Sequence, residues 1–329
     1  MIPENKRDAV EKALQFAFGV NNYDNIKLLT QGLSSALIFR IEIKGVPYLL
    51  RVITRTDPMG DPSYYYERMK AGAEAGLAPK IHYLSVEDRV SITDFINAKF
   101  FPQDVARESL ATTISKLHAL PKFPFRINYF DVMDGMFNRF LSAKIIPEEF
   151  TTEVVEIYNR LKKVYPCFEA TNLVSCHNDL KPENIIYDGH RAWLVDWEGA
   201  FLNDRYSDLA VVGNFVVSNE DDEAAFLKSY FGTAANEYQH ARFFLMTQIM
   251  HVFYFTAFIL LSCGGLPVDV AGIKVHDYRD FHNRIWNGEI TLHEAQPKYE
   301  YGWVHRNQFL KESKSPRFEE AIKIVSASR

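Results

Sequence analysis

The chain has 329 residues and is 47% hydrophobic, which is enough apolar material for a sizeable core and for two lobes. It carries 37 Lys and Arg against 42 Asp and Glu, and this net charge of −5 gives no general attraction to nucleic acid or to an anionic membrane. The three cysteines are too few and odd in number for a disulfide framework, so we expect free thiols and a cytoplasmic protein.

The first elements predicted are one helix and three strands. Residues 5–18 have apolar side chains on one helical face and begin with charged residues, unlike a secretory signal. Strands are predicted at residues 26–30, 36–43 and 46–53, because apolar and polar side chains alternate in 36–43 and Lys44-Gly45 suits a turn. The loop between the first two strands contains Gly, Ser34 and Ser35.

A loop of this composition can place backbone N–H groups and hydroxyls over phosphate oxygens. Taken alone it is more typical of an ordinary hairpin, but its position ahead of the motif described below favours a phosphate-binding role for Ser34 and Ser35. Further strands are predicted at 81–84 and 90–96. A helix at 109–120 then carries His118, which suits a structural role at a helix end better than a catalytic one. Residues 121–171 are interpreted as an insertion without assignable chemistry.

The stretch from Ser175 to Glu198 carries the chemistry. Asp179 lies in a polar loop, Asn184 follows five residues later, and a predicted two-residue turn at Asp188-Gly189 returns the chain to Asp196. These three side chains can therefore converge at one edge. They suit a hydroxyl-activating base, Asp179, and two oxygen ligands for Mg²⁺, Asn184 and Asp196.

The spacing H-x-D-x-x-x-x-N is shared by protein kinases and by small-molecule kinases of the same fold. The chain resembles the aminoglycoside phosphotransferase and choline kinase family more closely than protein kinases. It has Asp196-Trp-Glu198 in place of D-F-G, then Asn203-Asp204 and Asp208-Leu-Ala210, with no A-P-E afterwards. Within that family it is most similar to bacterial choline and ethanolamine kinases. The alternative, a polar hairpin on an ordinary α/β domain, requires three separate spacings to coincide by chance.

The resemblance implies an α+β, two-lobed protein-kinase-like fold. The N-terminal lobe, residues 1–97, would hold a small antiparallel sheet, and residues 98–329 would form a larger, mainly helical lobe. ATP and Mg²⁺ are the implied cofactors. The backbone groups of Asp94 and Ile96 would pair with adenine at the hinge, and Lys181 stands where protein kinases place a lysine that touches the transferred phosphate. Glu183 departs from the family pattern, in which glycine often precedes the asparagine.

Arg51 lies within an apolar strand, where an unpaired cation would be very costly. The resemblance implies that it neutralises the phosphates of ATP, since choline kinases have an arginine at this position. Glu67, on a helix predicted at residues 61–75, is the expected ion-pair partner, and Glu74 is a competing candidate. The alternative is that Arg51 faces solvent from an edge strand.

The family also implies a small cationic acceptor, with choline or ethanolamine favoured. Glu198, Asp204 and Tyr254 are the expected acceptor-binding residues, because carboxylates and ring faces attract an ammonium group. Alternatively, Glu198 pairs with Arg205 and the aromatic residues belong to the core. Other open possibilities are a different acceptor, such as an aminoglycoside, thiamine or homoserine, and a nucleotide-binding protein without turnover. The partners expected are thus ATP and a small-molecule acceptor, with no nucleic acid.

Residues 243–263 form an apolar run that is long enough to span a bilayer at about 1.5 Å per residue. Polar residues, among them Gln248 and His251, interrupt the run, and no basic segment flanks its end. We therefore predict a buried central helix and no membrane span, with a membrane segment as the alternative.

Overall fold

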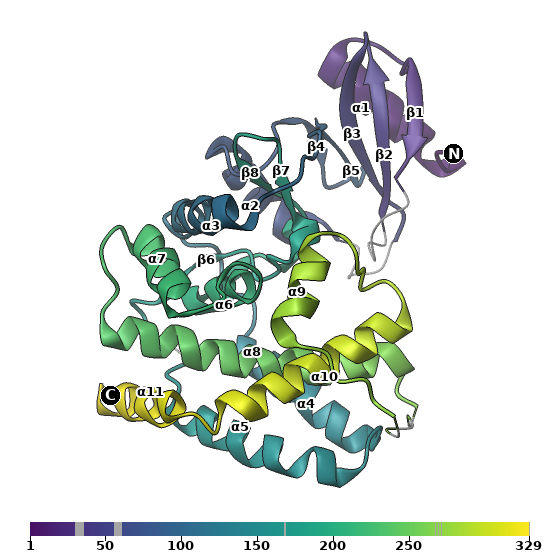
Figure 1. Ribbon diagram of the computed structural model, residues 1–329. Helices are drawn as coiled ribbons and strands as arrows, with labels where there is room; N and C mark the ends of the chain where they lie inside the picture. Colours follow the sequence, from purple (N-terminus) through teal and green to yellow (C-terminus); the bar gives the residue numbers. More distant parts are fainter. Residues whose placement is uncertain are drawn as a thin grey trace. The chain divides into compact units, whose positions relative to one another are not determined.

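The computed structural model describes residues 1–29, 36–55, 61–167, 169–266, 268, 270 and 272–328. The chain divides into two compact units, which we describe separately (Figure 1). The first unit comprises Met1–Phe100 and Glu183–Ala200, and the second comprises Phe101–Pro182 and Phe201–Arg329. The expected boundary at residue 97 lies close to the observed one, but residues 183–200 belong to the first unit and not to the C-terminal one.

An antiparallel sheet forms most of the first unit, as predicted. Its strand order is β1-β2-β3-β5-β4. The strands are β1 (Asn25–Leu28), β2 (Ala36–Ile43), β3 (Val46–Ile53), β4 (Ile81–Ser85) and β5 (Val90–Asp94). The helix α1 (Arg7–Phe18), preceded by a 3₁₀ turn η1 (Glu4–Lys6), packs Val10 and Leu14 against Phe39 and Ile41 of the sheet. Figure 1 shows this helix lying across β1 to β3. The helix α2 (Ser63–Glu74) follows β3 in the chain.

A second hairpin, β7 (Ile185–Tyr187) and β8 (Ala192–Leu194), joins the first unit through backbone hydrogen bonds. Lys99 N donates to Tyr187 O at 2.7 Å, and Leu194 N donates to Leu77 O at 2.8 Å. These bonds explain why residues 183–200 group with this unit. Asp188 N donates to Arg191 O at 3.2 Å, so the hairpin has a two-residue turn at Gly189 and His190, one position later than the predicted Asp188-Gly189. The reason is the Asp188 carboxylate, which accepts hydrogen bonds from the backbone N–H groups of His190 and Arg191.

The second unit is mainly helical, as the resemblance implied. Its helices are α3 (Gln103–His118), α4 (Tyr129–Ala143), α5 (Thr152–Val164), α6 (Arg205–Val216), α7 (Glu220–Phe231), α8 (Glu237–Cys263), α9 (Tyr278–Trp286), α10 (Ala295–Glu312) and α11 (Pro316–Ala327). A short antiparallel pair, β6 (Leu173–Cys176) and β9 (Phe201–Asp204), lies beside α6. Additional 3₁₀ turns are η3 (Glu148–Phe150), η4 (Pro182–Asn184), which spans the boundary, and η5 (Trp197–Gly199) of the first unit.

The helix α8 is the central helix of the second unit (Figure 1). It packs against α4, α6, α10 and α11. It begins at Glu237, six residues before the predicted apolar run, because Asn236 and Gln239 form a capping box there. Among the described residues, α8 is the one helix long and apolar enough to cross a membrane, with a mean hydropathy of 1.8 in its most apolar window. That window is 67% buried within the protein, as a core helix requires.

Candidate active site

Arg51 forms a charged cluster with two carboxylates inside the first unit. Its guanidinium Nη1 lies 3.4 Å from Oδ1 of Asp196, and its Nη2 donates to Oε1 of Glu198. Only 13% of the Arg51 side chain is exposed. Burial opposes the charge of Arg51, but Tyr65, Asp196 and Glu198 together raise its pKa above the usual value. Arg51 therefore faces these carboxylates and not open solvent from an edge strand.

The predicted pairing of Arg51 with Glu67 is wrong. Glu67 lies on the exposed stripe of α2 together with Ser63, Lys70 and Glu74, at helical spacings of three and four residues. The competing candidate, Glu74, is exposed on the same stripe. The buried face of α2 instead presents Tyr65, whose ring centroid lies 5.8 Å from the Arg51 guanidinium carbon. The carboxylates come from the segment after β8, which sequence reasoning placed in the other lobe.

Asp196 adopts a backbone conformation that is unusual for a residue with a side chain. Its φ is +63°, and such left-handed conformations are associated with functional sites in proteins. It precedes the 3₁₀ turn η5, but its side chain makes no capping hydrogen bond there. Val195 N donates to Asn184 O at 3.0 Å, so the start of β7 and the end of β8 bring Asn184 and Asp196 to the same end of the hairpin. The predicted metal ligands are thus close together in one unit.

Trp197 of the Asp196-Trp-Glu198 motif anchors this segment. It is 2% exposed, and its indole Nε1 donates to Leu194 O at 3.1 Å. The ring lies directly against Gly72 of α2, where a Cβ atom would stand 2.4 Å from Cζ2 of the indole. The glycine therefore permits the close approach of α2 that holds Asp196 and Glu198 opposite Arg51.

The remaining nucleotide-binding predictions concern a loop and a strand end. Ser34 and Ser35 lie outside the described residues. Asp94 is the last residue of β5, and its N–H already donates to Lys80 O at 2.9 Å. Its carboxylate lies 2.7 Å from Nε2 of His82. Asp94 can therefore offer only its carbonyl to adenine, and the donor would have to come from Ile96, which is half-buried.

Asp208 holds the loop that carries Asp179 in the second unit. The N–H groups of His177 and Asn178 donate to its two carboxylate oxygens at 2.8 Å and 2.7 Å. Asn178, with a φ of +63°, also accepts a hydrogen bond on Oδ1 from Nδ2 of Asn203 at 2.7 Å. The loop just before Asp179 is thus fixed at its backbone and at a side chain.

The two predicted catalytic side chains of this loop lie together. Nζ of Lys181 is 3.1 Å from Oδ2 of Asp179, and both side chains are more than 40% exposed. His118 is structural, as predicted, because it is buried and its ring nitrogens contact Tyr230 Oη at 2.7 Å and Asp208 at 3.1 Å. Sequence reasoning missed the roles of Asn178 and Asp208. The only signal for them was their place within the recognised motifs.

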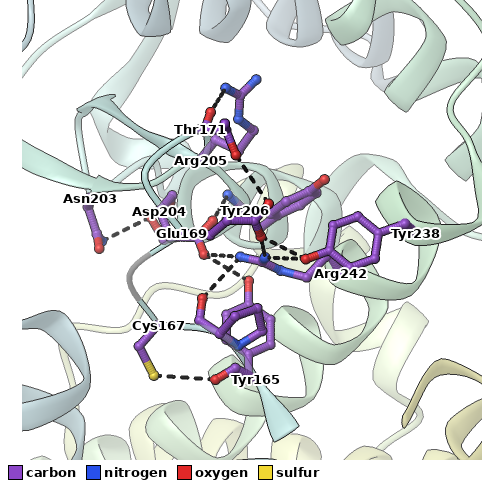
Figure 2. A network of polar contacts seen from close by, with 12 residues as sticks. Tyr165, Cys167, Glu169, Thr171, Asn203, Asp204, Arg205, Tyr206, Tyr238 and Arg242 are labelled. Carbon is purple, nitrogen blue, oxygen red and sulfur yellow. Dashed lines mark hydrogen bonds and ion pairs between the residues drawn. The ribbon is translucent and has the colours of Figure 1, made fainter. Parts of the chain in front are cut away.

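Two of the three predicted acceptor-binding residues are engaged elsewhere. Glu198 pairs with an arginine, as the alternative prediction expected, but that arginine is Arg51 and not Arg205. Asp204 is 2% exposed and pairs with the buried Arg242, as Figure 2 shows. Its acceptor role is therefore a wrong prediction, because its own carboxylate is buried and engaged by Arg242.

Tyr254 is half-buried on α8 beside aromatic residues of α10. Its ring centroid lies 5.8 Å from that of Tyr301 and 4.8 Å from that of His305. Its neighbour Phe255 is fully buried against Phe140 and belongs to the core. Tyr254 is therefore the aromatic residue of this pair that can still face a ligand.

A pocket of about 280 Å³ lies near His251 on the same helix. Its lining includes Asn214, Tyr278, Arg279 and Glu312. The side-chain atom Nδ2 of Asn214 is buried and lacks a hydrogen-bond partner among the described residues, whereas Nε2 of the buried His251 lies 3.8 Å from Oε2 of Glu312. The second unit therefore has a polar cavity beside α8 that a small molecule could fill.

Comparisons with known proteins show the family and the fold of this chain. The model of the phosphotransferase enzyme family matches residues 25–244. Protein LicA of Haemophilus influenzae is 28% identical over 222 residues, which cover 64% of this chain and 80% of LicA. The crystal structure of a choline/ethanolamine kinase family protein from Mesorhizobium loti has a TM-score of 0.66 at 18% identity, and the match covers 98% of this chain and 99% of that chain.

The crystal structure of spectinomycin phosphotransferase, in complex with ADP and spectinomycin, has a TM-score of 0.55 at 11% identity. The match covers 97% of this chain and 97% of that chain. These structural likenesses show the fold, and they confirm the predicted protein-kinase-like architecture. Because the family model matches well over half of the sequence and includes the motifs around Asp179 and Asp196, the chain belongs to the phosphotransferase enzyme family.

Proposed function

We propose that this protein is an ATP- and Mg²⁺-dependent kinase that phosphorylates the hydroxyl group of a small cationic metabolite, with choline or ethanolamine favoured. The observation that carries the proposal is the cluster of Asp196, Glu198 and Arg51, in which the segment after β8 brings two carboxylates to a guanidinium of β3 within one unit. A fixed cation and fixed carboxylates suit a metal-bound polyphosphate, because phosphoryl transfer depends mainly on positioning and on charge stabilisation.

The residues present fit the cofactors. Asn184 and Asp196 offer an amide and a carboxylate oxygen, the ligand types that Mg²⁺ prefers, and bound Mg²⁺ would neutralise charge on the phosphates of ATP. Arg51 would neutralise the phosphates that are not transferred. Asp179 would orient and deprotonate the acceptor hydroxyl, and Lys181 would contact the transferred phosphate. Ser34, Ser35 and the backbone of Asp94 and Ile96 remain proposed nucleotide contacts.

We assign the acceptor to the face of α8 that bears Tyr254. Met250 lies one helical turn earlier, and its sulfur is 3.9 Å from the hydroxyl of Tyr129. Burial raises the pKa of Tyr129, and the charges of Asp208 and Asp179 raise it further. Tyr129 is thus within electrostatic reach of Asp179 and in contact with α8. This supports an acceptor that lies between the proposed base and the aromatic residues near Tyr254.

A coupled ADP-release screen over choline, ethanolamine, thiamine, homoserine and aminoglycosides, with and without Mg²⁺, tests the proposal. We expect magnesium-dependent turnover, fastest on choline or ethanolamine. Turnover on an aminoglycoside alone would indicate antibiotic phosphorylation instead. We include these acceptors because the fold is also similar to that of spectinomycin phosphotransferase. Nucleotide binding with no turnover on any alcohol would support the non-catalytic alternative and refute the proposal.

A further inference from the structure

Arg242 lies at the centre of a buried polar cluster in the second unit (Figure 2). Its side chain, on α8, is fully buried, and its guanidinium donates to the carboxylates of Asp204 and Glu169. It also donates to Oη of Tyr238 at 3.0 Å, and its guanidinium carbon lies 4.5 Å from the ring centroid of Tyr165. A buried arginine with two carboxylate partners is a fixed point, since breaking such a pair leaves an uncompensated charge.

Asp204 connects this cluster to the start of α6. Its Oδ2 contacts Arg242 and accepts a hydrogen bond from Tyr165 Oη at 3.1 Å. Its Oδ1 accepts from the N–H of Tyr206 at 3.0 Å and so caps α6. Burial raises the pKa of Asp204, and Arg242 opposes that shift and favours the ionised form. The Asp204 carboxylate therefore links the first turn of α6 to Arg242 of α8, and the ring of Tyr206, 5.1 Å from the guanidinium carbon, adds a second contact there.

The catalytic loop is held from the same segment. Asp208 lies four residues after Asp204, one turn along α6, and accepts both backbone N–H groups that precede Asp179. Asn203, the residue before Asp204, donates to the side chain of Asn178. A displacement of the start of α6 would therefore reach the loop through two separate contacts.

We propose that Arg242 is a positioning residue for the Asp179 loop, acting through Asp204 and the first turn of α6. This inference rests on the proposed function, because it assumes that Asp179 is the catalytic base. Without Arg242 the start of α6 moves, and Asp179 no longer meets the acceptor hydroxyl in the productive orientation. Arg51 and Asp196 lie in the other unit, so binding of ATP should be affected little.

Two variants that replace a side chain with one of similar size test this proposal. Arg242→Lys keeps the charge but removes the two Nη groups that reach Glu169 and Asp204 at the same time, and Asp204→Asn keeps an N-cap but removes the ion pair. We expect kcat to fall about 10- to 100-fold in each, as for a misplacement of about 1 Å, with KM for ATP within about twofold. Tyr238→Phe is the matched control, because it removes a neutral partner of Arg242 and leaves both of its carboxylates and the described hydrogen bonds of α6 in place. We expect its kcat within about twofold of the unmodified protein.

Hydrogen exchange at the N–H groups of His177 and Asn178 gives a readout that does not need activity. We expect faster exchange at these two amides in Arg242→Lys and Asp204→Asn, with unchanged exchange in the sheet of the first unit. An unmodified protein without turnover would refute the proposed function, but the exchange experiment would still test the positioning role. Unchanged kcat and exchange in folded Asp204→Asn would overturn the inference, as would faster exchange spread evenly over the second unit. If Arg242→Lys does not fold, Asp204→Asn decides alone.

Discussion

Gly72→Ala should damage the nucleotide-binding side of the protein without touching any charged residue. Gly72 lies within α2, and its Cα approaches the indole of Trp197 so closely that a methyl group would stand 2.4 Å from Cζ2 and 2.5 Å from Cη2. Carbon atoms in ordinary contact are about 3.5–4.0 Å apart. The added methyl group therefore requires α2 and Trp197 to separate by about 1 Å.

The size of the effect follows from two opposing terms. Alanine in place of glycine inside a helix stabilises by about 1 kcal/mol, whereas forcing extra atoms into a packed core costs about 1–3 kcal/mol. The difference is a loss of up to about 2 kcal/mol in the free energy of unfolding, and we expect its upper end because Trp197 is 2% exposed and cannot rotate away. Because Trp197 lies between Asp196 and Glu198, the same shift should raise KM for Mg·ATP about tenfold.

Urea unfolding and a titration of Mg·ATP at saturating acceptor measure the two effects. Gly135→Ala is the matched control, since Gly135 lies inside α4 and a Cβ there would meet no atom within 4 Å. We expect this control to be as stable as the unmodified protein or up to about 1 kcal/mol more stable. A Gly72→Ala protein that gains stability like the control and keeps its KM would refute the close packing against Trp197.

Four further predictions address single groups. Asp179→Ala should lower kcat about 10²- to 10⁴-fold while ATP binding, measured by calorimetry, persists; turnover within a few-fold of the original would remove Asp179 from the mechanism. Arg51→Met should raise KM for ATP, whereas Glu67→Gln should leave it unchanged; equal effects would restore Glu67 as a partner. Tyr254→Leu should lower kcat/KM for choline more than for its uncharged isostere 3,3-dimethylbutan-1-ol, and an equal loss for both would place Tyr254 outside the acceptor site. Burial opposes the ionised form of Asp188, but hydrogen bonds from Trp193, Arg191 and His190 lower its pKa from 3.8 to about 2. The ionised carboxylate therefore stabilises the fold above about pH 4, and this stabilisation is lost as the pH falls through about 2. Asp188→Asn should lower Tm at about pH 5 but less at about pH 2, and equal losses at both pH values would contradict this.

Local patterns predicted the fold of the first unit well. Alternation of apolar residues gave β2 and β3 with their observed ends, because each side chain position in a strand repeats every two residues. The assignment of residues 183–200 was less accurate for a physical reason. Its attachment depends on backbone bonds from Leu194 to Leu77 and from Lys99 to Tyr187, and a backbone bond leaves no signature in side-chain type.

Motif spacing selected the candidate site residues, but it could not predict which of them pair. Arg51 needed a partner on energetic grounds, and the helix predicted after its strand offered Glu67 as an acid not far along the sequence. The actual partners are separated from Arg51 by more than 140 residues in sequence. The partner of Arg51 depends on which face of α2 is buried. Gly72 allows Trp197 to approach α2, and the sequence alone does not show that these two residues are in contact.

The two carboxylates expected to attract a cationic acceptor are each already paired with a guanidinium, Glu198 with Arg51 and Asp204 with Arg242. A paired carboxylate adds little attraction for a third charge, since the field of the neighbouring cation opposes it. Selection for a cation would then depend on ring faces, and Tyr254 has Tyr301 within 5.8 Å to share that role. A cation–π contact contributes about 0.5–2 kcal/mol, which corresponds to a preference of about 2- to 30-fold for choline over its uncharged isostere. A preference of a thousandfold would show instead that an unpaired acid elsewhere in the second unit binds the acceptor.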